Sequence, residues 1–522
     1  MTDTAPRLAR SPGEAGQRLD AVDADNGVGD HRDRREVTWA DGGVGVLVAG
    51  ALAFVAARPL VDNSFLTHLA TGRIFLADGF PTTNPFLYSS TDFPLPSWLW
   101  SVVLGVTDAV GGGVGIRILT AVLAAVLGLV VVRLTRPYEG PAGDLPMLPQ
   151  SAVDGVTAAP RSLLSIVLPT VCVLVTLMPF LNARPQLPGY LLLATTVLVV
   201  KERRSPWWLV PIFALWLNIH GTWMYGLAVL GLLVVVQVLD DRRVRPSQVG
   251  CAAAAVLGVV VGGVVGPEPF RLIGLPFEQF GDDRARRAIS SYVEWQPSGW
   301  GHPLTWMLMA MGLVAVFGAV RSRRWGVLVG SVAMVAMGLS AGRLLPLAAI
   351  TLVPWVSAGL RLLAVAESMQ LPGGRRARAL AVTGAALGVV SFGWILLTPP
   401  YDLSSYPVEA VDWLQVRGLA GSSEVKVASH DFVGNYLDWR FGDRANTFVD
   451  DRADVDAILD YGVLKDLDRG WRSALGRTDA DVIVWQTDEK LTSRLDEPDW
   501  YRAGRFGDFS VFCRSSIADR CS

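Results

Sequence analysis

The sequence has little lysine, little histidine and almost no net charge. Lysine occurs only as Lys201, Lys426, Lys465 and Lys490, so arginine supplies nearly all of the 46 basic residues. This preference is typical of a GC-rich genome, and the abundance of arginine is therefore not a functional signal in itself. The formal net charge is −2, which gives no electrostatic basis for binding nucleic acid.

Cysteine is also scarce, with 4 residues in 522, and no Cys/His cluster has the spacing of a zinc site. Cys172 and Cys251 fall within apolar segments and are expected to be inert core residues. Cys513 and Cys521 lie near the C-terminus, where they form a disulfide if this region is exported, or remain two free thiols. The sequence also lacks a P-loop, a G-x-S-x-G elbow, an H-E-x-x-H helix and a Rossmann fingerprint in context, which excludes the commonest soluble-enzyme sites.

Long apolar segments dominate the chain instead. Hydrophobic residues make up 51% of the sequence and the mean hydropathy is +0.37, values that indicate a polytopic α-helical membrane protein. On the criterion of about 20 apolar residues per span, we expect roughly eleven transmembrane helices. The candidate segments are 43–60, 114–134, 162–181, 186–200, 206–218, 221–239, 249–266, 303–320, 325–341, 344–363 and 379–397.

Basic residues predict the orientation of these helices. Under this count, five basic connections fall on one side of the membrane, around residues 133–136, 201–204, 242–245, 321–324 and 375–378. The positive-inside rule makes that side cytoplasmic. The alternate connections, which include the loops 61–113 and 267–302, then lie outside the cytoplasm. This parity requires that Trp98 to Val110 is an interfacial or re-entrant helix and not a full span.

Three parts of the chain follow from this pattern. Residues 1–40 are polar and predict a disordered cytoplasmic tail. Residues 41–398 form the transmembrane domain of a multi-pass cell-membrane protein, with a Pro/Gly-rich cytoplasmic linker over 135–161. From about Pro399 the apolar runs shorten, and residues 399–522 predict a small extracytoplasmic α/β domain. The expected helices are 408–416, 432–439 and 455–475, and the expected strands are 425–428, 446–449, 481–486 and 509–513.

The first outer loop is the most informative stretch. Asp62 stands where the first span leaves the hydrocarbon, and a helical pattern follows it. Apolar and polar residues alternate at helical spacing, with Phe65, Leu66, Leu69 and Leu76 on one face and Ser64, Thr67, His68 and Thr71 on the other. This pattern predicts an amphipathic helix that lies in the membrane interface with its apolar face down.

Polar residues also recur at the outer ends of several spans. They are Asp62, His68, Arg73, Asn182, Arg184, Gln186, Asn218, His220, Glu294 and Arg343. Taken alone, each of these residues is best explained as a polar side chain at the place where a helix leaves the membrane and meets water. Charge near a membrane is costly, however, so a set of five such sites on one face favours a functional interpretation. The charged outer loop 267–302, by contrast, is best explained as solvated surface.

A plausible chemistry for this geometry is group transfer from a lipid-anchored donor. A polyprenyl-phosphate sugar places its anionic head at the outer interface. A carboxylate must orient or deprotonate an acceptor hydroxyl, and cations must hold the leaving phosphate. Asp62 fits the first role and Arg184 or Arg343 the second, while His68 is a candidate phosphate ligand or base. Arg73, His220 and Glu294 complete the set of candidate substrate-binding residues.

These residues resemble, in type and order, the GT-C superfamily of polytopic glycosyltransferases, which use polyprenyl-phosphate sugars. More closely, the chain resembles a bacterial, actinobacterial-type branch of GT-C-like membrane proteins, over most of residues 41–515. The first outer loop of that branch has an Asp-x-Asp start, a His-Leu-x-x-Gly segment and a G-x-P-x-x-D-P-F run. The matching residues are Asp62, His68, Leu69, Gly72, Gly79, Pro81, Asn84, Pro85, Phe86, Trp98 and Leu99, with further matches at 184–186, 218–221, 294–295 and 448–452.

The resemblance implies a GT-C-like fold with its catalytic acid in the first outer loop and a soluble outer C-terminal domain. Two acids of the branch are replaced here, by Ser64 and Asn84. A divalent cation therefore stays open as a cofactor, but a metal site made of paired acids is not expected.

Three functions remain open at this point. The first is a glycosyltransferase of the EC 2.4 class, which moves a sugar from a polyprenyl-phosphate donor to a cell-envelope acceptor at the outer face. The second is a transporter or flippase for a lipid-linked intermediate, although no pair of broken helices in related halves supports it. The third is an inactive envelope scaffold that binds a protein partner through its C-terminal domain. The segment 450–452 is the place to examine there, and a structural Asp–Arg pair at a turn is its simpler explanation.

Overall fold

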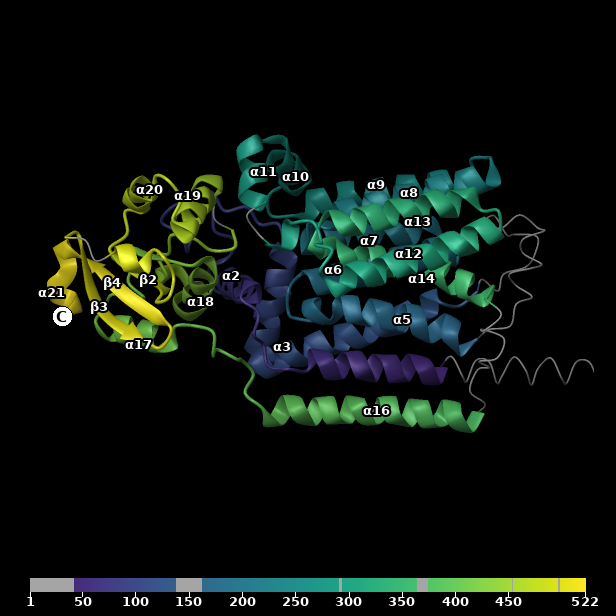
Figure 1. Cartoon of the computed structure of the whole chain (residues 1–522), viewed down its shortest axis with the longest axis horizontal. Coiled ribbons are helices and arrows are strands. Elements are labelled where there is room, and N and C mark those ends of the chain that lie inside the picture. Colours follow the sequence, from purple (N-terminus) through teal and green to yellow (C-terminus); the bar gives the residue numbers. More distant parts are fainter. Residues whose placement is uncertain (1–41, 138–161, 291–292, 364–373, 453, 496–497) are drawn as a thin grey trace, which may run out of the picture.

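The computed structural model describes residues 42–137, 162–290, 293–363, 374–452, 454–495 and 498–522. The predicted N-terminal tail and most of the predicted 135–161 linker lie outside the described residues. Figure 1 shows two bodies along the long axis of the molecule: a bundle of long helices and a smaller domain with a sheet.

The bundle is built from the apolar segments that the sequence contains. Its helices are Gly42–Ala56, α3 (Trp98–Leu134), α5 (Leu163–Leu177), α6 (Gln186–Lys201), α7 (Leu209–Ile219), α8 (Trp223–Asp241), α9 (Pro246–Val265), α12 (Pro303–Arg321), α13 (Trp325–Ser340), α14 (Leu345–Arg361) and α16 (Gly374–Leu397). Within the described residues, seven helices are long and apolar enough to cross a membrane, and four shorter apolar helices lie among them. The chain is thus a membrane protein, while the count of about eleven spans stays a prediction.

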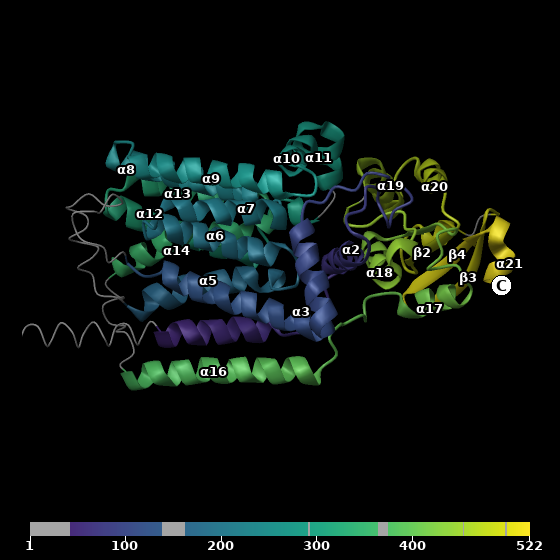
Figure 2. The ribbon, with the colours of Figure 1, turned by 180° about the vertical axis from the view of Figure 1, so that it is seen from behind.

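The segment from Trp98 to Val110 is the first part of α3. The helix is bent at Gly112, whose backbone (φ 57°, ψ −156°) is not helical. Only glycine adopts such a conformation without strain. Figures 1 and 2 show the first part of α3 standing across the end of the bundle, and the second part running along it. This placement agrees with a segment that does not add a separate span.

The basic connections meet at the end of the bundle that is remote from the sheet. Arg133 forms an ion pair with Glu202, and Lys201 donates a hydrogen bond to the Arg133 carbonyl. Arg324 lies 3.6 Å from Asp240. These contacts agree with the prediction that the basic connections share one side of the bundle.

Aromatic side chains are exposed at both ends of the bundle. Trp207 and Trp325 are exposed at the starts of α7 and α13, and Trp300 and Trp306 near the start of α12. Tryptophan is enriched where transmembrane helices meet the lipid headgroups. These residues therefore agree with a bundle that lies in a membrane with its two ends at the interfaces.

The first outer loop contains α2 (Ser64–Asp78), which confirms the predicted helix. It packs between α3 and α18 (Asp431–Phe441) of the C-terminal domain, as both views show. Its polar face is buried too, because Thr67 and Thr71 are each 1% exposed. The helix is thus enclosed by protein on two sides, whereas the sequence pattern predicted a helix with a polar face in water.

The C-terminal region is an α/β domain, as predicted. Its elements are α17 (Val408–Val416), β1 (Val427–Ser429), α18, α19 (Val455–Asp466), α20 (Trp471–Thr478), β2 (Val482–Gln486), β3 (Trp500–Phe506), β4 (Phe509–Arg514) and α21 (Ala518–Cys521). The sheet has the order β1-β2-β4-β3, with β1 parallel to β2 and the other pairs antiparallel. Cys513 in β4 forms a disulfide with Cys521, which resolves the alternative that the sequence left open.

Three local predictions in this domain differ from the structure. The expected helix 455–475 is two helices, because Leu467 and Gly470 turn the chain through left-handed conformations between them. Residues 446–449 make only isolated bridges, through Thr447, to Val427 and Leu87, and not a strand of their own. The sequence analysis missed β3, whose polar residues face solvent at the edge of the sheet.

A fully buried arginine fastens the end of the bundle from which the chain passes to the C-terminal domain. Arg117 in α3 donates hydrogen bonds to the carbonyl oxygens of Ala57, Ile395 and Thr398. These carbonyls lie at or just beyond the ends of the first helix and of α16. Because every one of these acceptors is a backbone oxygen at a helix end, Arg117 fixes the place where the chain leaves the bundle.

Candidate functional site

Asp62 is positioned by the start of α2. Its Oδ1 accepts the backbone N–H of Ser64 at 3.0 Å, a contact typical of an acid that initiates a helix. The following residues fold back over the end of the bundle, where α3 and α18 enclose the helix. The carboxylate of Asp62 is thereby fixed at the junction of the bundle and the C-terminal domain.

Arg184 is the main partner of Asp62. Its Nε donates to Asp62 Oδ1 at 2.5 Å, and its Nη2 donates to Asn63 Oδ1 at 2.9 Å. Asn182 orients both residues, because its Oδ1 accepts the Arg184 N–H and its Nδ2 donates to Asp62 Oδ2 at 3.0 Å. Burial by itself would lower the pKa of Arg184, but the charges of Asp62, Asp451 and Glu294 raise it above its ordinary value. Arg184 is therefore a permanent cation in this site.

Glu294 extends this network to a second arginine. Glu294 lies in the short turn η4 (Val293–Trp295), and its Oε2 is 3.4 Å from Arg184 Nη1. Its Oε1 accepts a hydrogen bond of 3.2 Å from Nη1 of Arg343, which lies in η5 (Gly342–Leu344). The guanidinium of Arg343 stacks on the Trp295 ring at 4.2 Å. Four predicted site residues from four separate connections thus form one continuous chain: Asp62, Arg184, Glu294 and Arg343.

Both predicted site histidines are neutral. Burial, then Arg452 and Arg184, lowers the pKa of His68 to about 3. Its Nδ1 is 3.1 Å from Ser101 Oγ in α3. The pKa of His220 is likewise lowered well below its ordinary value by burial, then by Arg343, His68 and Arg184. A neutral imidazole cannot bind phosphate as a cation, and a pKa of about 3 makes it a poor base, so His68 is left the role of a neutral hydrogen-bond partner.

Other predicted polar residues lie outside this chain of contacts. Arg73 is 42% exposed and forms an ion pair of 2.8 Å with Asp108 of α3. Asn218 accepts a hydrogen bond from Trp98 and donates to two backbone carbonyls, so it fastens helix ends together. For these two residues, the simpler explanation offered by the sequence, a polar group at a helix end, agrees with the contacts.

The C-terminal domain adds a carboxylate that was not among the predicted site residues. Asp451 lies close enough to Arg184 for its charge to raise the pKa of that arginine. Its own side chain accepts no hydrogen bond from another described residue. Asp450 and Arg452 behave differently: both are buried, and Asp450 Oδ1 accepts the backbone N–H of Arg452 at 2.7 Å. The structural pair expected for this segment thus involves Asp450 and Arg452, while the charge of Asp451 acts on Arg184.

The side chains around Asp62 do not fit a divalent cation. The described residues contain no group of three His, Cys, Asp or Glu side chains that could hold a metal ion. Asp62 Oδ1 already accepts two hydrogen bonds, and Oδ2 accepts one from Asn182. Ser64 and Asn84 supply no second acid here: Asn84 Oδ1 accepts the N–H groups of Phe86 and Leu87 in a turn. The cationic group beside Asp62 is the Arg184 guanidinium.

The comparisons with known proteins concern the fold. No family model and no curated protein sequence matches this chain. Among solved structures, the oligosaccharyltransferase of Archaeoglobus fulgidus in complex with zinc and sulfate matches with a TM-score of 0.50 and 10% identity, over 85% of this chain and 68% of that one. The same enzyme tethered to an acceptor peptide with an NVT sequon matches with a TM-score of 0.47 and 10% identity, over 85% and 69% of the two chains.

At 10% identity the likeness extends to the fold and to nothing finer. It covers both bodies of the chain, since 85% of the residues are matched. The resemblance read from the first outer loop predicted this same architecture of an apolar helical domain followed by a smaller C-terminal domain. The protein is therefore a membrane protein with a GT-C-like fold.

Proposed function

We propose that the protein is a membrane glycosyltransferase that moves a sugar from a polyprenyl-phosphate donor to a cell-envelope acceptor at the outer face of the plasma membrane. The observation that carries this proposal is the chain of contacts from Asp62 through Arg184 and Glu294 to Arg343. It joins a carboxylate with an open position to two guanidinium groups, at the end of the bundle where the C-terminal domain docks. The likeness to an oligosaccharyltransferase supports the same class of reaction.

The remaining acceptor position on Asp62 defines its part in the reaction. A carboxylate has about four lone-pair positions, and the protein occupies both on Oδ1 and one on Oδ2. The fourth, on Oδ2, is free for an acceptor hydroxyl. A hydrogen bond there would orient the hydroxyl oxygen toward C1 of the donor sugar. The Asp62 carboxylate would then accept the hydroxyl proton late in the transfer.

The two arginines have different parts. Arg184 is already engaged by Asp62, Asn63 and Glu294, so it holds the carboxylate in place and balances its charge. Arg343 donates one hydrogen bond to Glu294, is 12% exposed, and makes no further hydrogen bond within the described residues. Its remaining N–H groups are available to the donor phosphate, and stacking on Trp295 keeps the guanidinium plane fixed.

The proposed step balances without a co-reactant. The bond between C1 and the phosphate oxygen breaks as the bond between C1 and the acceptor oxygen forms. The bonding electrons pass to the phosphate oxygen, where Arg343 stabilises the developing charge. The acceptor proton moves to Asp62 Oδ2 and then to solvent or to the released phosphate. The neutral imidazole of His68 contributes hydrogen bonding without adding charge.

The orientation of the protein completes the proposal. The basic connections gather at the end of the bundle remote from the site, which the positive-inside rule places in the cytoplasm. The disulfide between Cys513 and Cys521 agrees with an exported C-terminal domain, since disulfides persist in oxidising compartments. The site would then face the leaflet in which a polyprenyl-phosphate head group is presented outside the cell.

The test is a transfer assay in membranes. Vesicles with wild-type protein or Asp62→Asn receive a panel of labelled polyprenyl-phosphate sugars together with envelope acceptors. We expect product from the wild type and a loss of roughly 10²–10⁴-fold in the variant, the range for removal of a proton-transfer group. Asp78→Asn is the matched control, because Asp78 is exposed at the far end of the same helix, α2.

Several results would contradict this proposal. Equal transfer by wild type and Asp62→Asn would remove the assigned role of the carboxylate. Movement of a labelled lipid across proteoliposomes with no covalent product would indicate the flippase alternative. Lack of product from every donor, together with a stoichiometric partner on gentle purification, would indicate the scaffold alternative.

A further inference from the structure

Three charged side chains are buried together where the C-terminal domain meets α2. Asp438 lies in α18, and Asp450 and Arg452 follow in the segment after it. The carboxyls of Asp438 and Asp450 are inaccessible, and the Arg452 side chain is 9% exposed. Burial of three charged groups carries a large desolvation cost, so their contacts must offset it.

Arg452 contacts the first outer loop at three places. Its Nη1 donates a hydrogen bond to Thr71 Oγ1 in α2. Its guanidinium lies over the rings of Phe86 at 5.1 Å and Phe93 at 4.9 Å. Nη2 is 3.7 Å from Asp450 Oδ2. Nearly all of the contacts that hold this cation thus come from outside the C-terminal domain.

The carboxyl groups of Asp438 and Asp450 are both inaccessible to solvent and lie close enough for their charges to interact. Asp438 Oδ1 accepts a hydrogen bond of 3.3 Å from Thr447, and its Oδ2 lies 3.5 Å from Thr67 Oγ1 of α2. Burial and the adjacent Asp450 raise the pKa of Asp438 well above its ordinary range, and burial likewise raises that of Asp450. Two raised pKa values favour retention of a proton by the pair, which would leave a single negative charge opposite Arg452.

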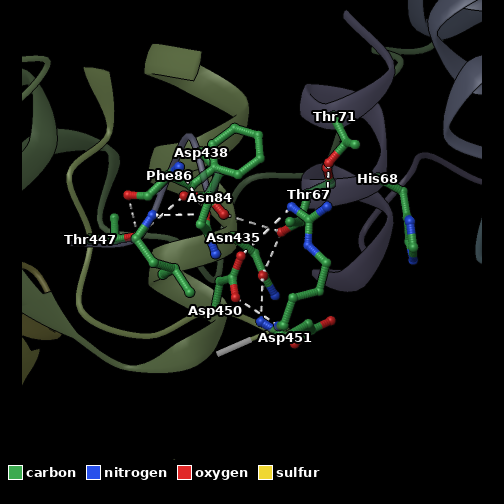
Figure 3. A network of polar contacts seen from close by, with 12 residues as sticks. Thr67, His68, Thr71, Asn84, Phe86, Asn435, Asp438, Thr447, Asp450 and Asp451 are labelled. Atoms are coloured by element: carbon green, nitrogen blue, oxygen red, sulfur yellow. Dashed lines mark hydrogen bonds and ion pairs between the residues drawn. The ribbon is translucent and has the colours of Figure 1, made fainter. Parts of the chain in front are cut away.

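These contacts fix the segment that carries Asp451. The backbone N–H of Asp451 donates to Asn435 Oδ1 at 3.1 Å, and the same oxygen accepts Thr67 Oγ1 at 2.5 Å. Figure 3 shows Thr67 directed from α2 toward Asn435 and Asp438, with Asp450 and Asp451 beside them. Gly434 lets the segment lie directly on α18, since a side chain there would overlap the Val449 carbonyl.

We propose that Asp438, Asp450 and Arg452 are positioning residues that form a buried clasp, and that this clasp docks the C-terminal domain on α2 and fixes the segment that carries Asp451. The consequence for sugar transfer rests on the proposed function, whereas docking is a property of the fold that is measured without substrate. The clasp makes the C-terminal domain a part of the transfer site.

The clasp gives docking a defined pH dependence. The charged and titratable groups that face it are Asp451, His68 and Arg184, and His68 is neutral. Since the carboxyl pKa values are raised in the docked state, the stabilisation is complete below the ordinary carboxyl range. It is lost as the pH rises through the raised value, because two buried carboxylates then face one guanidinium.

Hydrogen exchange of the full-length protein in lipid nanodiscs tests this proposal. In the wild type, amides of α2 and of residues 446–452 should lose protection together, beyond the intrinsic rise in exchange rate, as the pH is raised above the ordinary carboxyl range. Asp438→Asn keeps a hydrogen-bond donor that does not titrate. In this variant, the loss of amide protection beyond the intrinsic rise in exchange rate should therefore be absent. Arg452→Met leaves the buried acids without their cation and should raise exchange roughly a hundredfold at every pH. Asp460→Asn breaks an ion pair with the exposed Arg477 and should follow the wild type.

The outcomes separate the clasp from the proposed function. Wild-type pH dependence in Asp438→Asn, or normal protection in Arg452→Met, would overturn the proposal whatever the transfer assay gives. If Asp438→Asn flattens the pH dependence of docking, the alkaline fall in transfer rate should flatten with it. A protein that docks as expected but never transfers sugar would contradict the proposed function and leave the clasp standing.

Discussion

Both ends of the helical bundle bury charged side chains, but the two ends use them differently. At the end remote from the sheet, Asp240 Oδ1 accepts the N–H of Gly326 at 2.6 Å, where α13 begins, and Arg324 lies beside it. Asp241, the last residue of α8, forms an ion pair of 3.2 Å with Arg245, which precedes α9. These contacts join the end of one helix to the start of another, so each charged side chain stabilises the terminus of a helix.

At the site, the charges come from connections far apart in the chain and leave positions open. Asp62 Oδ2 has an unused acceptor position, and Arg343 has N–H groups with no acceptor among the described residues. Two neutral histidines and the carboxylate of Asp451 lie around them. The comparison teaches that burial of charge is not in itself a sign of function. Open hydrogen-bonding capacity at a junction of domains is the more specific sign.

The sharpest test of this comparison is a matched pair of arginine variants. Arg343→Met should reduce transfer about 10²–10³-fold, the effect of removing one donor that stabilises a developing oxyanion. The thermal midpoint should change little, because the side chain has one hydrogen bond and a stacking contact to lose. Transfer rates and melting curves are measured on the same preparation in detergent. Full activity in Arg343→Met would show that the open cation is not used.

The other member of the pair is Arg324→Met. Asp240 is only 2% exposed, so loss of its cation should lower the stability by about 3 kcal/mol. The rate of transfer per folded molecule should stay at the wild-type value, because this end of the bundle has no contact with the site. Melting curves and active-fraction measurements check this. A large fall in rate at unchanged stability would mean that the remote end also takes part in the reaction.

Removal of the disulfide should have a smaller effect, on the stability of the C-terminal domain. Cys513 and Cys521 are 8 residues apart, and closing a loop of this size is worth about 2–3 kcal/mol in the chain-entropy model. The double variant Cys513→Ser/Cys521→Ser should lose up to that amount and keep its rate of transfer. Reduction of the wild type should give the same shift. A fall in transfer beyond the loss of folded protein would contradict a purely stabilising disulfide.

The smallest expected effect is the change in acid sensitivity on replacement of the neutral His68. Because the pKa of His68 is about 3 in the folded protein against 6.5 in the unfolded chain, it should give no step in the transfer rate near neutral pH. Its contribution to stability is complete above pH 6.5 and falls as the pH drops toward 3. His68→Asn should therefore lose less of its thermal stability on acidification. Identical acid sensitivity in the two proteins would show that His68 does not titrate as the structure indicates.

Local sequence patterns predicted the architecture and named residues that meet at the site. Apolar runs of span length, the change of composition near Pro399 and the helical pattern after Asp62 are local features, so they predict helices and domains without any knowledge of packing. The chemical argument named Asp62 as the carboxylate and Arg184 or Arg343 as the cation, and the structure places all three in one network of contacts. Local patterns succeed here because hydrophobic burial and backbone hydrogen bonding act over a few turns of chain.

Only the tertiary structure decided which polar residues meet and in what state. Asp62 and Arg184 are 122 residues apart. Arg73 is also an arginine and lies much nearer to Asp62 in the sequence, but it pairs with Asp108, and no local pattern indicates this choice of partner. The neutrality of His68 depends on burial by α3 and on cations from other segments. The charge of Asp451 reaches Arg184 because Asp450 and Arg452 on either side of it are buried beside α2. Contacts of this kind depend on the summed packing of distant segments, and single-chain periodicity carries no information about them.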